Sequence, residues 1–342
     1  MAFDGLPYIL GWELTLACNL RCEHCGSAAG IARDSELSTD EALILCNQLP
    51  ELLVQEVDFT GGEPLVRKDW SIIAARLNRM GIPVNIISNG LALNRDAALL
   101  AKKTGIAHIG ISLDGLERTH DRLRGHRGLF RKVVNAIEIL NSVEIPLTVL
   151  TTVTEMNAHE LPSLRELLMS IGVTQWRLQP LFQFGRVKDF PELVLSEKTY
   201  LDFGAFMKDI CSNKGSRMQV LAADSCGYFS ELDLRDPAWH GCNAGLVTCG
   251  ITADGKIKGC LSLPDSLVEG DLRKKDLWSI WFDPNAFKYT RGFTANDLGQ
   301  NCFACEKAMQ CQGGCSAMSL SSTDKLHNDP YCYHRLMKQS RC

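Results

Sequence analysis

The chain has 342 residues, of which 45% are hydrophobic and 22% are charged, and this globular composition excludes wholesale disorder. Its 36 basic and 40 acidic residues give a net charge of -4, which argues against nucleic acid or an anionic membrane surface as the main partner. It shows no secretory signal and no apolar run of membrane-spanning length, so we expect a cytoplasmic protein. In that reducing compartment, 15 Cys indicate metal or redox chemistry rather than disulfides.

Strand-like and helix-like segments alternate through the first half of the chain. Apolar or β-branched runs predict strands at 8–16, 55–60, 84–88, 108–113, 147–153 and 176–181. Helical periodicity predicts helices at 39–52, 70–80, 95–103, 129–141 and 161–171. Such units pair in parallel through right-handed crossovers, which leaves a doubly wound sheet or an incomplete (β/α) barrel. In both folds the site lies at the carboxyl ends of the strands.

Residues with chemical potential follow these predicted strands. Cys18 follows the first strand, a Gly-Gly-Glu-Pro turn at 61–64 follows the second, and Ser88 closes the third. Ser112 closes the fourth strand, and Gln179 lies at the end of the sixth. We therefore expect these residues to meet at one edge of the sheet.

The cysteines divide the chain into a Cys-poor body with one N-terminal triplet and a Cys-dense tail. A helix at 200–211 and a bridge at 220–236 are expected to connect the two parts. The predicted regions are a core domain at 1–195, a helical linker and bridge at 196–241, and a Cys-rich domain at 242–342.

The N-terminal triplet is C-x3-C-x2-C, formed by Cys18, Cys22 and Cys25. Three soft ligands without a nearby fourth Cys suit an iron-sulfur cluster that keeps one iron open. Structural zinc normally takes four protein ligands. His24 could in principle be the fourth ligand of a zinc site. Because it stands between Glu23 and Cys25 in the chain, however, its side chain cannot easily reach the metal that the cysteines bind.

The triplet and the turn at 61–64 together resemble the radical S-adenosylmethionine (SAM) superfamily, over about residues 8–181. The resemblance implies an α/β fold with a partial (β/α)6 TIM-like barrel. It also implies that the triplet holds a [4Fe-4S] cluster whose unique iron chelates SAM. One-electron cleavage of SAM then gives a 5′-deoxyadenosyl radical that abstracts a substrate hydrogen.

The same resemblance assigns residues to SAM. Gly62 and Glu63 would bind the amino group of SAM, because glycine allows close backbone approach and a carboxylate accepts from an ammonium group. His24 occupies a position that neighbours the adenine. The other expected contacts are Ser88 and Ser112 near the ribose or carboxylate, and Gln179 near the nucleoside.

Eight tail cysteines allow two cages of four thiolates, with zinc ribbons as the alternative from spacing alone. A G-x4-C motif, a C-x2-C-x5-C-x3-C run and a final Cys resemble the SPASM extension of radical SAM peptide-modifying enzymes. This implies two auxiliary [4Fe-4S] clusters, hence three clusters in all. The implied ligands are Cys242, Cys249, Cys260 and Cys315 for the nearer cluster, and Cys302, Cys305, Cys311 and Cys332 for the farther one.

Eight thiolates would leave neither auxiliary cluster with an open iron, which favours a role in electron transfer over direct binding of the substrate. Cys249 is the least certain ligand, because family members with fewer cysteines have an open coordination position there. Cys46 and Cys211 lie in apolar helical stretches and predict buried core thiols. Cys342 is terminal. Cys226 lies between body and tail, where a structural role is favoured over a catalytic or ligand role.

We predict a peptide maturase that acts on a ribosomally made precursor and installs an intramolecular cross-link by hydrogen abstraction. The tail clusters would accept the electron left after bond formation, and a flavodoxin or ferredoxin would be the electron donor. Leu261 stands where sulfatase-maturating enzymes typically carry an Asp base, which argues against that activity. The seventeen residues before Cys18 leave no room for an N-terminal recognition domain, so a separate leader-recognition protein is a further possible partner.

Two other functions stay open at this point. One is an enzyme of a cofactor or small-molecule pathway, for example a porphyrin pathway. The other is a non-catalytic electron carrier or zinc-binding scaffold, which metal analysis would distinguish. The general base is not assigned, because a structural role is favoured for Asp114, Asp224 and Tyr228.

Overall fold

The computed structural model describes residues 5–212, 216–223, 226 and 241–339. Its strands are β1 (Ile9–Thr15), β2 (Glu56–Gly61), β3 (Val84–Ser88), β4 (Ile106–Ser112), β5 (Leu147–Val153), β6 (Gln175–Pro180), β7 (Gln219–Ala222), β8 (Thr248–Ile251), β9 (Lys256–Lys258) and β10 (Gly270–Asp271). Its α-helices are α1 (Thr39–Gln48), α2 (Trp70–Arg79), α3 (Arg95–Thr104), α4 (Glu117–Leu123), α5 (Leu129–Ser142), α6 (Leu161–Ser170), α7 (Glu197–Ser212), α8 (Leu277–Trp281), α9 (Lys288–Arg291), α10 (Ala308–Cys311), α11 (Ser316–Thr323) and α12 (Tyr333–Gln339).

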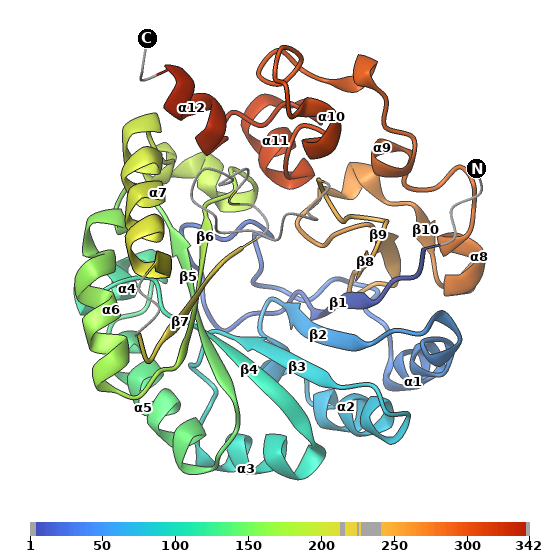
Figure 1. The fold of residues 1–342 in the computed structure, drawn as a ribbon. Coiled ribbons are helices and arrows are strands. Elements are labelled where there is room, and N and C mark those ends of the chain that lie inside the picture. The colour runs from blue at the N-terminus through green and yellow to red at the C-terminus, as the bar shows by residue number, and fades with distance from the viewer. Residues whose placement is uncertain (1–4, 213–215, 224–225, 227–240, 340–342) are drawn as a thin grey trace.

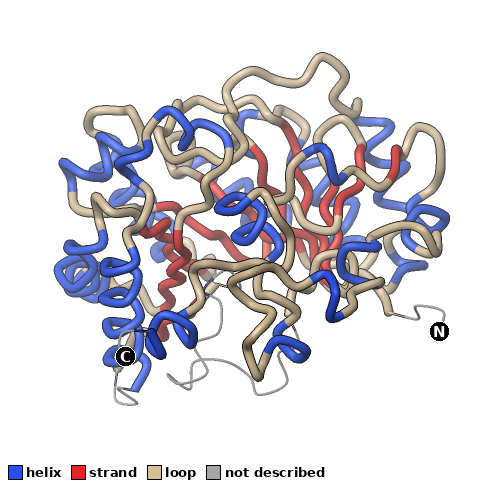
Figure 2. Tube along the Cα trace, turned by 90° about the horizontal axis from the view of Figure 1, so that it is seen from above, coloured by secondary structure: helices blue, strands red, loops and turns tan. Residues whose placement is uncertain are grey.

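One sheet contains all of these strands, in the order β10-β9-β8-β1-β2-β3-β4-β5-β6-β7. From β1 to β7 each strand pairs in parallel with the next strand of the chain. A doubly wound sheet would reverse its order at a switch point, so this sequential order selects the incomplete barrel. Helices α1 to α6 lie along the outer side of the curved sheet (Figure 1), and helices flank the strands when the molecule is seen from above (Figure 2). The predicted α/β fold is confirmed.

The predicted strands agree with β1 to β6 to within two residues at each end, while two helical segments differ. The predicted helix at 39–52 ends at Gln48. Pro50, which has no N–H to continue the helix, begins a 3-10 turn that closes at Leu53 with φ of 51°. Helix α4 was not predicted, because seven mostly polar residues carry little apolar periodicity.

The core of the barrel fixes the first strands. Trp12 on β1 and Phe59 on β2 are both 0% exposed, and their rings meet edge to face with centroids 5.8 Å apart. Ser38 caps α1, since it exchanges hydrogen bonds with Glu41 as a capping box. Because the strands of the body are parallel, their carboxyl ends and the residues that follow them lie at one rim of the barrel.

The Cys-rich tail continues the sheet of the body. Strand β8 pairs in parallel with β1, so that Cys249 lies opposite Leu10, and β9 and β10 add in antiparallel orientation. The domain boundary between 241 and 242 stays a prediction, and the strand that follows it is hydrogen bonded to the first strand of the body. Among the described residues, no helix is long and apolar enough to cross a membrane.

The connection between body and tail is described in part. The predicted helix at 200–211 is confirmed as α7, and the first residues of the predicted bridge belong to β7, which pairs with β6. Asp224 and Tyr228 lie outside the described residues. Helix α12 packs on α7.

Gly204 on α7 tests this contact between body and tail. A Cβ at Gly204 would come within 2.1 Å of the ring of Tyr333, which is 4% exposed. In an open helix Gly→Ala stabilises by about 1 kcal/mol, whereas overpacking costs about 1–3 kcal/mol. We therefore expect Gly204→Ala to lower the free energy of unfolding in urea, while Ala205→Ser, on the exposed side of α7, changes it little. A more stable Gly204→Ala variant would contradict this packing.

Candidate functional site

The predicted thiol triplet lies in the loop between β1 and α1, and this loop is tied to the end of β1. The backbone N–H of Cys18 donates to the carbonyl of Gly30 at 3.0 Å, and the N–H of Gly30 donates to the carbonyl of Leu16 at 3.1 Å. Because these bonds join Gly30 back to Leu16 and Cys18, the segment that carries the three thiols forms a closed loop at the carboxyl end of β1.

Arg186, in a 3-10 turn after β6, binds the same loop from a segment far from it in the strand order. Its Nε donates to the carbonyl of Cys22 at 2.7 Å, and its Nη1 donates to the carbonyl of Ala29 at 2.8 Å. Its backbone N–H donates to the carbonyl of Cys25 at 3.1 Å. Sequence analysis missed Arg186, because no local pattern shows that these segments meet.

The Gly-Gly turn after β2 lies against the start of the Cys loop. A Cβ at Gly62 would come within 2.1 Å of the carbonyl oxygen of Ala17, and one at Gly61, where φ is 120°, within 2.4 Å of the carbonyl oxygen of Thr15. The N–H of Gly62 donates to Thr15 at 2.8 Å and that of Glu63 to Ala17 at 2.9 Å. Glycine is therefore required at both positions. The sequence predicts a close approach of the Gly62 backbone to SAM, and in the structure this backbone closely approaches the start of the Cys loop.

The carboxylate of Glu63 is 0% exposed and gathers three donors. Its Oε1 accepts from the hydroxyl of Ser88 at 2.9 Å and the N–H of Leu65 at 3.2 Å, and its Oε2 accepts from the N–H of Asn89 at 2.7 Å. Burial raises the pKa of Glu63 to about 6, although these donors oppose the increase. The side chain of Asn89, which sequence analysis missed, donates to the sulfur of Cys18 at 3.7 Å. Glu63 and Ser88 thus meet as expected, beside the triplet.

Asp114 is the centre of a buried polar network after β4. Its Oδ2 lies 2.6 Å from Nε of Arg124 and 3.1 Å from Nε2 of His24, and its Oδ1 accepts from the N–H of Thr152 at 2.9 Å. Burial alone would raise the pKa of Asp114, but Arg124 and His24 hold that pKa well below its usual range. Asp114 is therefore a buried carboxylate, and Arg124 is its buried counter-ion.

The thiols of the triplet are close enough that one raises the pKa of another. Burial raises the pKa of Cys22 to about 11, the Arg124 guanidinium opposes this, and the thiols of Cys25 and Cys18 add to it. A bound metal supplies the positive charge that deprotonates such thiols. Ring nitrogen Nε2 of His24 is engaged by the carboxylate of Asp114 at 3.1 Å. This donor set fits an iron-sulfur cluster with one open iron better than structural zinc.

The other residues expected around SAM lie along the same rim. Ser112 is 9% exposed at the end of β4, and Gln179 on β6 is half-buried. The amide of Gln179 donates to the hydroxyl of Thr152 at 3.2 Å, and the N–H of Thr152 in turn donates to Asp114. The expected contact of His24 with adenine stays a prediction.

Four thiols of the tail form one group. Burial raises the pKa of Cys302 to about 12, with further increases from Asp329, Cys332 and Cys305. Burial also raises the pKa of Cys311, again with contributions from Cys332, Asp329 and Cys302. The structure thus gathers the four cysteines that the sequence predicts as ligands of the farther cluster, and Asp329 places a carboxyl group beside them.

A second group of tail thiols contains Cys242, Cys260 and Cys315, which pack in one apolar cluster. Burial raises the pKa of Cys260 and of Cys315, and the neighbouring Cys242 adds to both increases. Cys249 is 1% exposed in a different cluster, the main core of the barrel. Of the four ligands predicted for the nearer cluster, the structure brings three together.

The remaining cysteines lie apart from these groups. Cys46 is 0% exposed, which confirms the prediction of a core thiol. Cys211 is only half-buried, so the prediction of a buried thiol was wrong at that position. Cys211 lies at the last turn of α7, and its Sγ is 3.8 Å from the carbonyl of Val220 on the adjacent edge strand. The thiol of Cys226 is 0% exposed and donates to the carbonyl of Leu178 at 3.6 Å. Cys342 lies outside the described residues.

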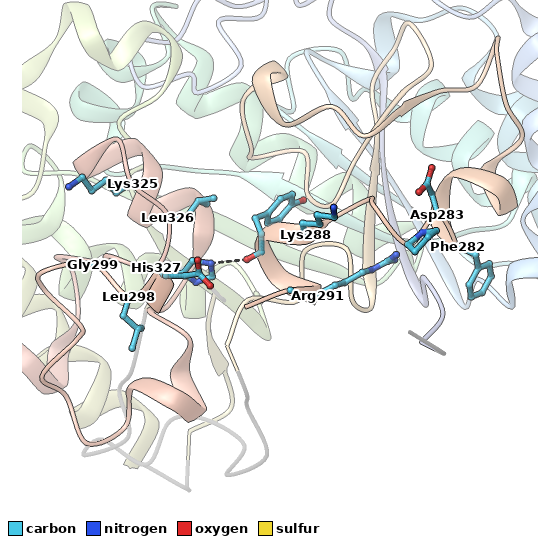
Figure 3. A pocket seen from close by; sticks show the side chains of 13 residues that line it. Phe282, Asp283, Lys288, Arg291, Leu298, Gly299, Lys325, Leu326 and His327 are labelled. Atoms are coloured by element: carbon cyan, nitrogen blue, oxygen red, sulfur yellow. Dashed lines mark hydrogen bonds between the residues drawn. The ribbon is translucent and has the colours of Figure 1, made fainter. Parts of the chain in front are cut away.

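A cavity of about 950 Å³ lies in the tail, away from the triplet. Lys288, Arg291, Lys325 and His327 contribute to its lining (Figure 3). Ring nitrogen Nε2 of His327 lies 2.7 Å from the carbonyl oxygen of Tyr289, so this side chain joins two segments of the tail. None of the predicted cluster ligands lines this cavity.

Comparison with known proteins agrees with this geometry. Residues 12–168 match the family model of the radical SAM superfamily. The AdoMet-dependent heme synthase of Methanosarcina barkeri is 28% identical over 98% of this chain and 99% of its own length. The mycofactocin maturase MftC of Mycolicibacterium smegmatis is 29% identical over 95% of this chain and 82% of its own length. The crystal structure of Streptococcus suis SuiB bound to precursor peptide SuiA has the same fold, with a TM-score of 0.75 and 17% identity over 96% of this chain and 76% of that chain.

The chain therefore carries a radical SAM domain, and the resemblance drawn from its sequence is confirmed.

The Gly-Gly turn gives a direct test of the loop. Gly62→Ala places a methyl group against the backbone of Ala17 and is expected to displace the Cys loop, so that the reconstituted protein loses about four irons per chain. Gly26→Ala is the matched control, because Gly26 lies next to Cys25 with nothing within 4 Å of its Cβ position. Iron and sulfide analysis measures both variants, and full iron loading of Gly62→Ala would contradict the contact.

The buried ion pair gives a stability test. Arg124→Met leaves the buried Asp114 carboxylate without its main counter-ion, and we expect a loss of about 3–5 kcal/mol in urea unfolding of the metal-free protein. Arg122→Met, on a side chain 57% exposed, is the control and should change stability by less than about 0.5 kcal/mol. The double variant Arg124→Met/Asp114→Asn should lose less than the sum of the two single losses. Simple additivity would show that the pair is not coupled.

Proposed function

We propose that this radical SAM enzyme acts on a tetrapyrrole. The supporting observation is that heme synthase resembles this chain over nearly the whole length of both proteins. This favours the cofactor-pathway alternative of the sequence analysis over the peptide maturase that the sequence favoured.

In this proposal Cys18, Cys22 and Cys25 hold a [4Fe-4S] cluster. With SAM bound there, the reduced cluster would supply the electron that cleaves SAM to methionine and a 5′-deoxyadenosyl radical. The guanidinium of Arg124 places a buried positive charge beside the thiolates of Cys22 and Cys25, which offsets their mutual repulsion. Arg186 and the Gly-Gly turn hold the loop in place from two sides.

Glu63 is the residue proposed to meet the amino group of SAM, with Gly62. Ser88 and Asn89 orient its carboxylate, and full burial keeps water away from it. Burial raises the pKa of Glu63 to about 6, which is still below neutral pH, so the ionised carboxylate can accept from an ammonium group. Ser112 and Gln179 are proposed contacts of SAM farther along the rim, and His24 is the proposed neighbour of the adenine.

The tail is proposed to be a SPASM domain with two auxiliary clusters, beginning near residue 242. Two separate groups of thiols in the tail support this, one of four and one of three. Such clusters would accept electrons released when the substrate radical is oxidised. A flavodoxin or ferredoxin is the proposed donor for the cluster at the triplet.

A second candidate function is maturation of a ribosomally made peptide, with formation of a cross-link. The observation in its favour is the common fold with SuiB, whose structure was solved with its precursor peptide, together with the similarity to mycofactocin maturase. In that case a separate leader-recognition protein remains a possible partner.

The two functions are separated by following the abstracted hydrogen. The reconstituted enzyme is incubated without oxygen with SAM, dithionite and an iron porphyrin deuterated on its carboxyethyl side chains. We expect deuterium in the 5′-deoxyadenosine and an altered porphyrin mass, and neither with Cys22→Ala. Unlabelled 5′-deoxyadenosine with an unchanged porphyrin contradicts the tetrapyrrole proposal. Loss of two hydrogens from a peptide encoded beside the gene would then support the second candidate.

A further inference from the structure

The two faces of strand β8 have different neighbours. Successive side chains of a strand point to opposite faces, so Thr248 and Gly250 share one face, and Cys249 and Ile251 share the other. A Cβ at Gly250 would come within 2.8 Å of the backbone nitrogen of Leu261 and 3.0 Å of the carbonyl carbon of Cys260. The face of Gly250 is therefore the one that looks onto Cys260.

Thr248 confirms the direction of this face. Its hydroxyl lies 3.0 Å from the carbonyl oxygen of Gly259, the residue before Cys260. It also lies 3.0 Å from the carbonyl oxygen of Asn243, the residue after Cys242. Thus Thr248 points toward the segments that carry two of the three grouped thiols.

Cys249 lies on the opposite face of β8, in the main hydrophobic core. It lies opposite Leu10 of β1, and Leu10, Cys249 and Ile251 belong to the same core cluster, each no more than 1% exposed. The grouped thiols Cys242 and Cys315 belong to a separate apolar cluster.

We propose that Cys242, Cys260 and Cys315 hold the nearer auxiliary cluster through three thiolates, and that Cys249 is a core residue and not the fourth ligand. One iron of this cluster is then open to an external donor atom. The cysteine count of the tail allows ligation by four thiolates. The alternation of side chains along β8, however, places Cys249 on the face that is turned away from Cys260. An open iron gives this cluster a capacity to bind a substrate or small-molecule donor that a fully ligated cluster lacks.

The ligand set is tested without turnover, in a Cys18→Ala/Cys22→Ala/Cys25→Ala background that removes the SAM-binding cluster. In this background, Cys249→Val keeps a branched apolar side chain in the core, and we expect unchanged iron and sulfide content and an unchanged EPR spectrum of the reduced clusters. Cys260→Ala is the matched positive control and should lose about four irons per chain. A loss in Cys249→Val equal to that in Cys260→Ala would overturn the proposal.

The open iron is tested with cyanide, a small donor that binds exposed iron. Cyanide is expected to shift the EPR signal of one auxiliary cluster in the background protein and in Cys249→Val. Thr248→Cys adds a thiol on the face that looks onto Cys260 and should abolish the shift. An unshifted spectrum in the background protein would contradict the open iron, and a shift that persists in Thr248→Cys would contradict the orientation of β8. These readouts do not depend on which substrate the enzyme uses.

Discussion

The site depends on one close backbone contact, between the Gly-Gly turn after β2 and the residues that lead from β1 into the Cys loop. The N–H groups of Gly62 and Glu63 continue the hydrogen bonding of the β1–β2 pair beyond the strands themselves. Because there is no room for a Cβ at Gly61 or Gly62, the loop can begin immediately above the sheet. The position of the first thiol follows from this contact.

Buried charge completes the arrangement. Glu63 and Asp114 are both 0% exposed, yet their environments act on them in opposite directions. Neutral donors surround Glu63, so burial dominates and raises its pKa, whereas a guanidinium pairs with Asp114 and keeps its pKa low. Arg124 therefore serves both as the counter-ion of Asp114 and as a positive charge beside the thiols of the loop. An arrangement of this kind holds the thiols close together before a metal group binds, and it supplies a positive charge beside the thiolates once the group is bound.

Much of this could be predicted from the sequence, because strand patterns and glycine turns are local signals. The six parallel strands of the body and the triplet after the first one follow from such signals. Arg186 and Asn89 could not be found in this way, since their roles depend on segments that meet only in the folded barrel. Cys249 illustrates the limit most clearly: the resemblance to SPASM proteins groups it with Cys260, while the alternation of a four-residue strand separates the two residues. Tail strands this short carry little periodic signal, so their facing is visible only in the structure.

The central claim is that the loop between β1 and α1 holds a cluster with one iron open to SAM. Pulsed electron-nuclear spectroscopy of the reduced protein with SAM labelled by nitrogen-15 at its amino group measures this most directly. The account predicts a hyperfine coupling between the labelled nitrogen and the cluster, which disappears when Cys22 is replaced by Ala. A fully iron-loaded protein that shows no such coupling would contradict it.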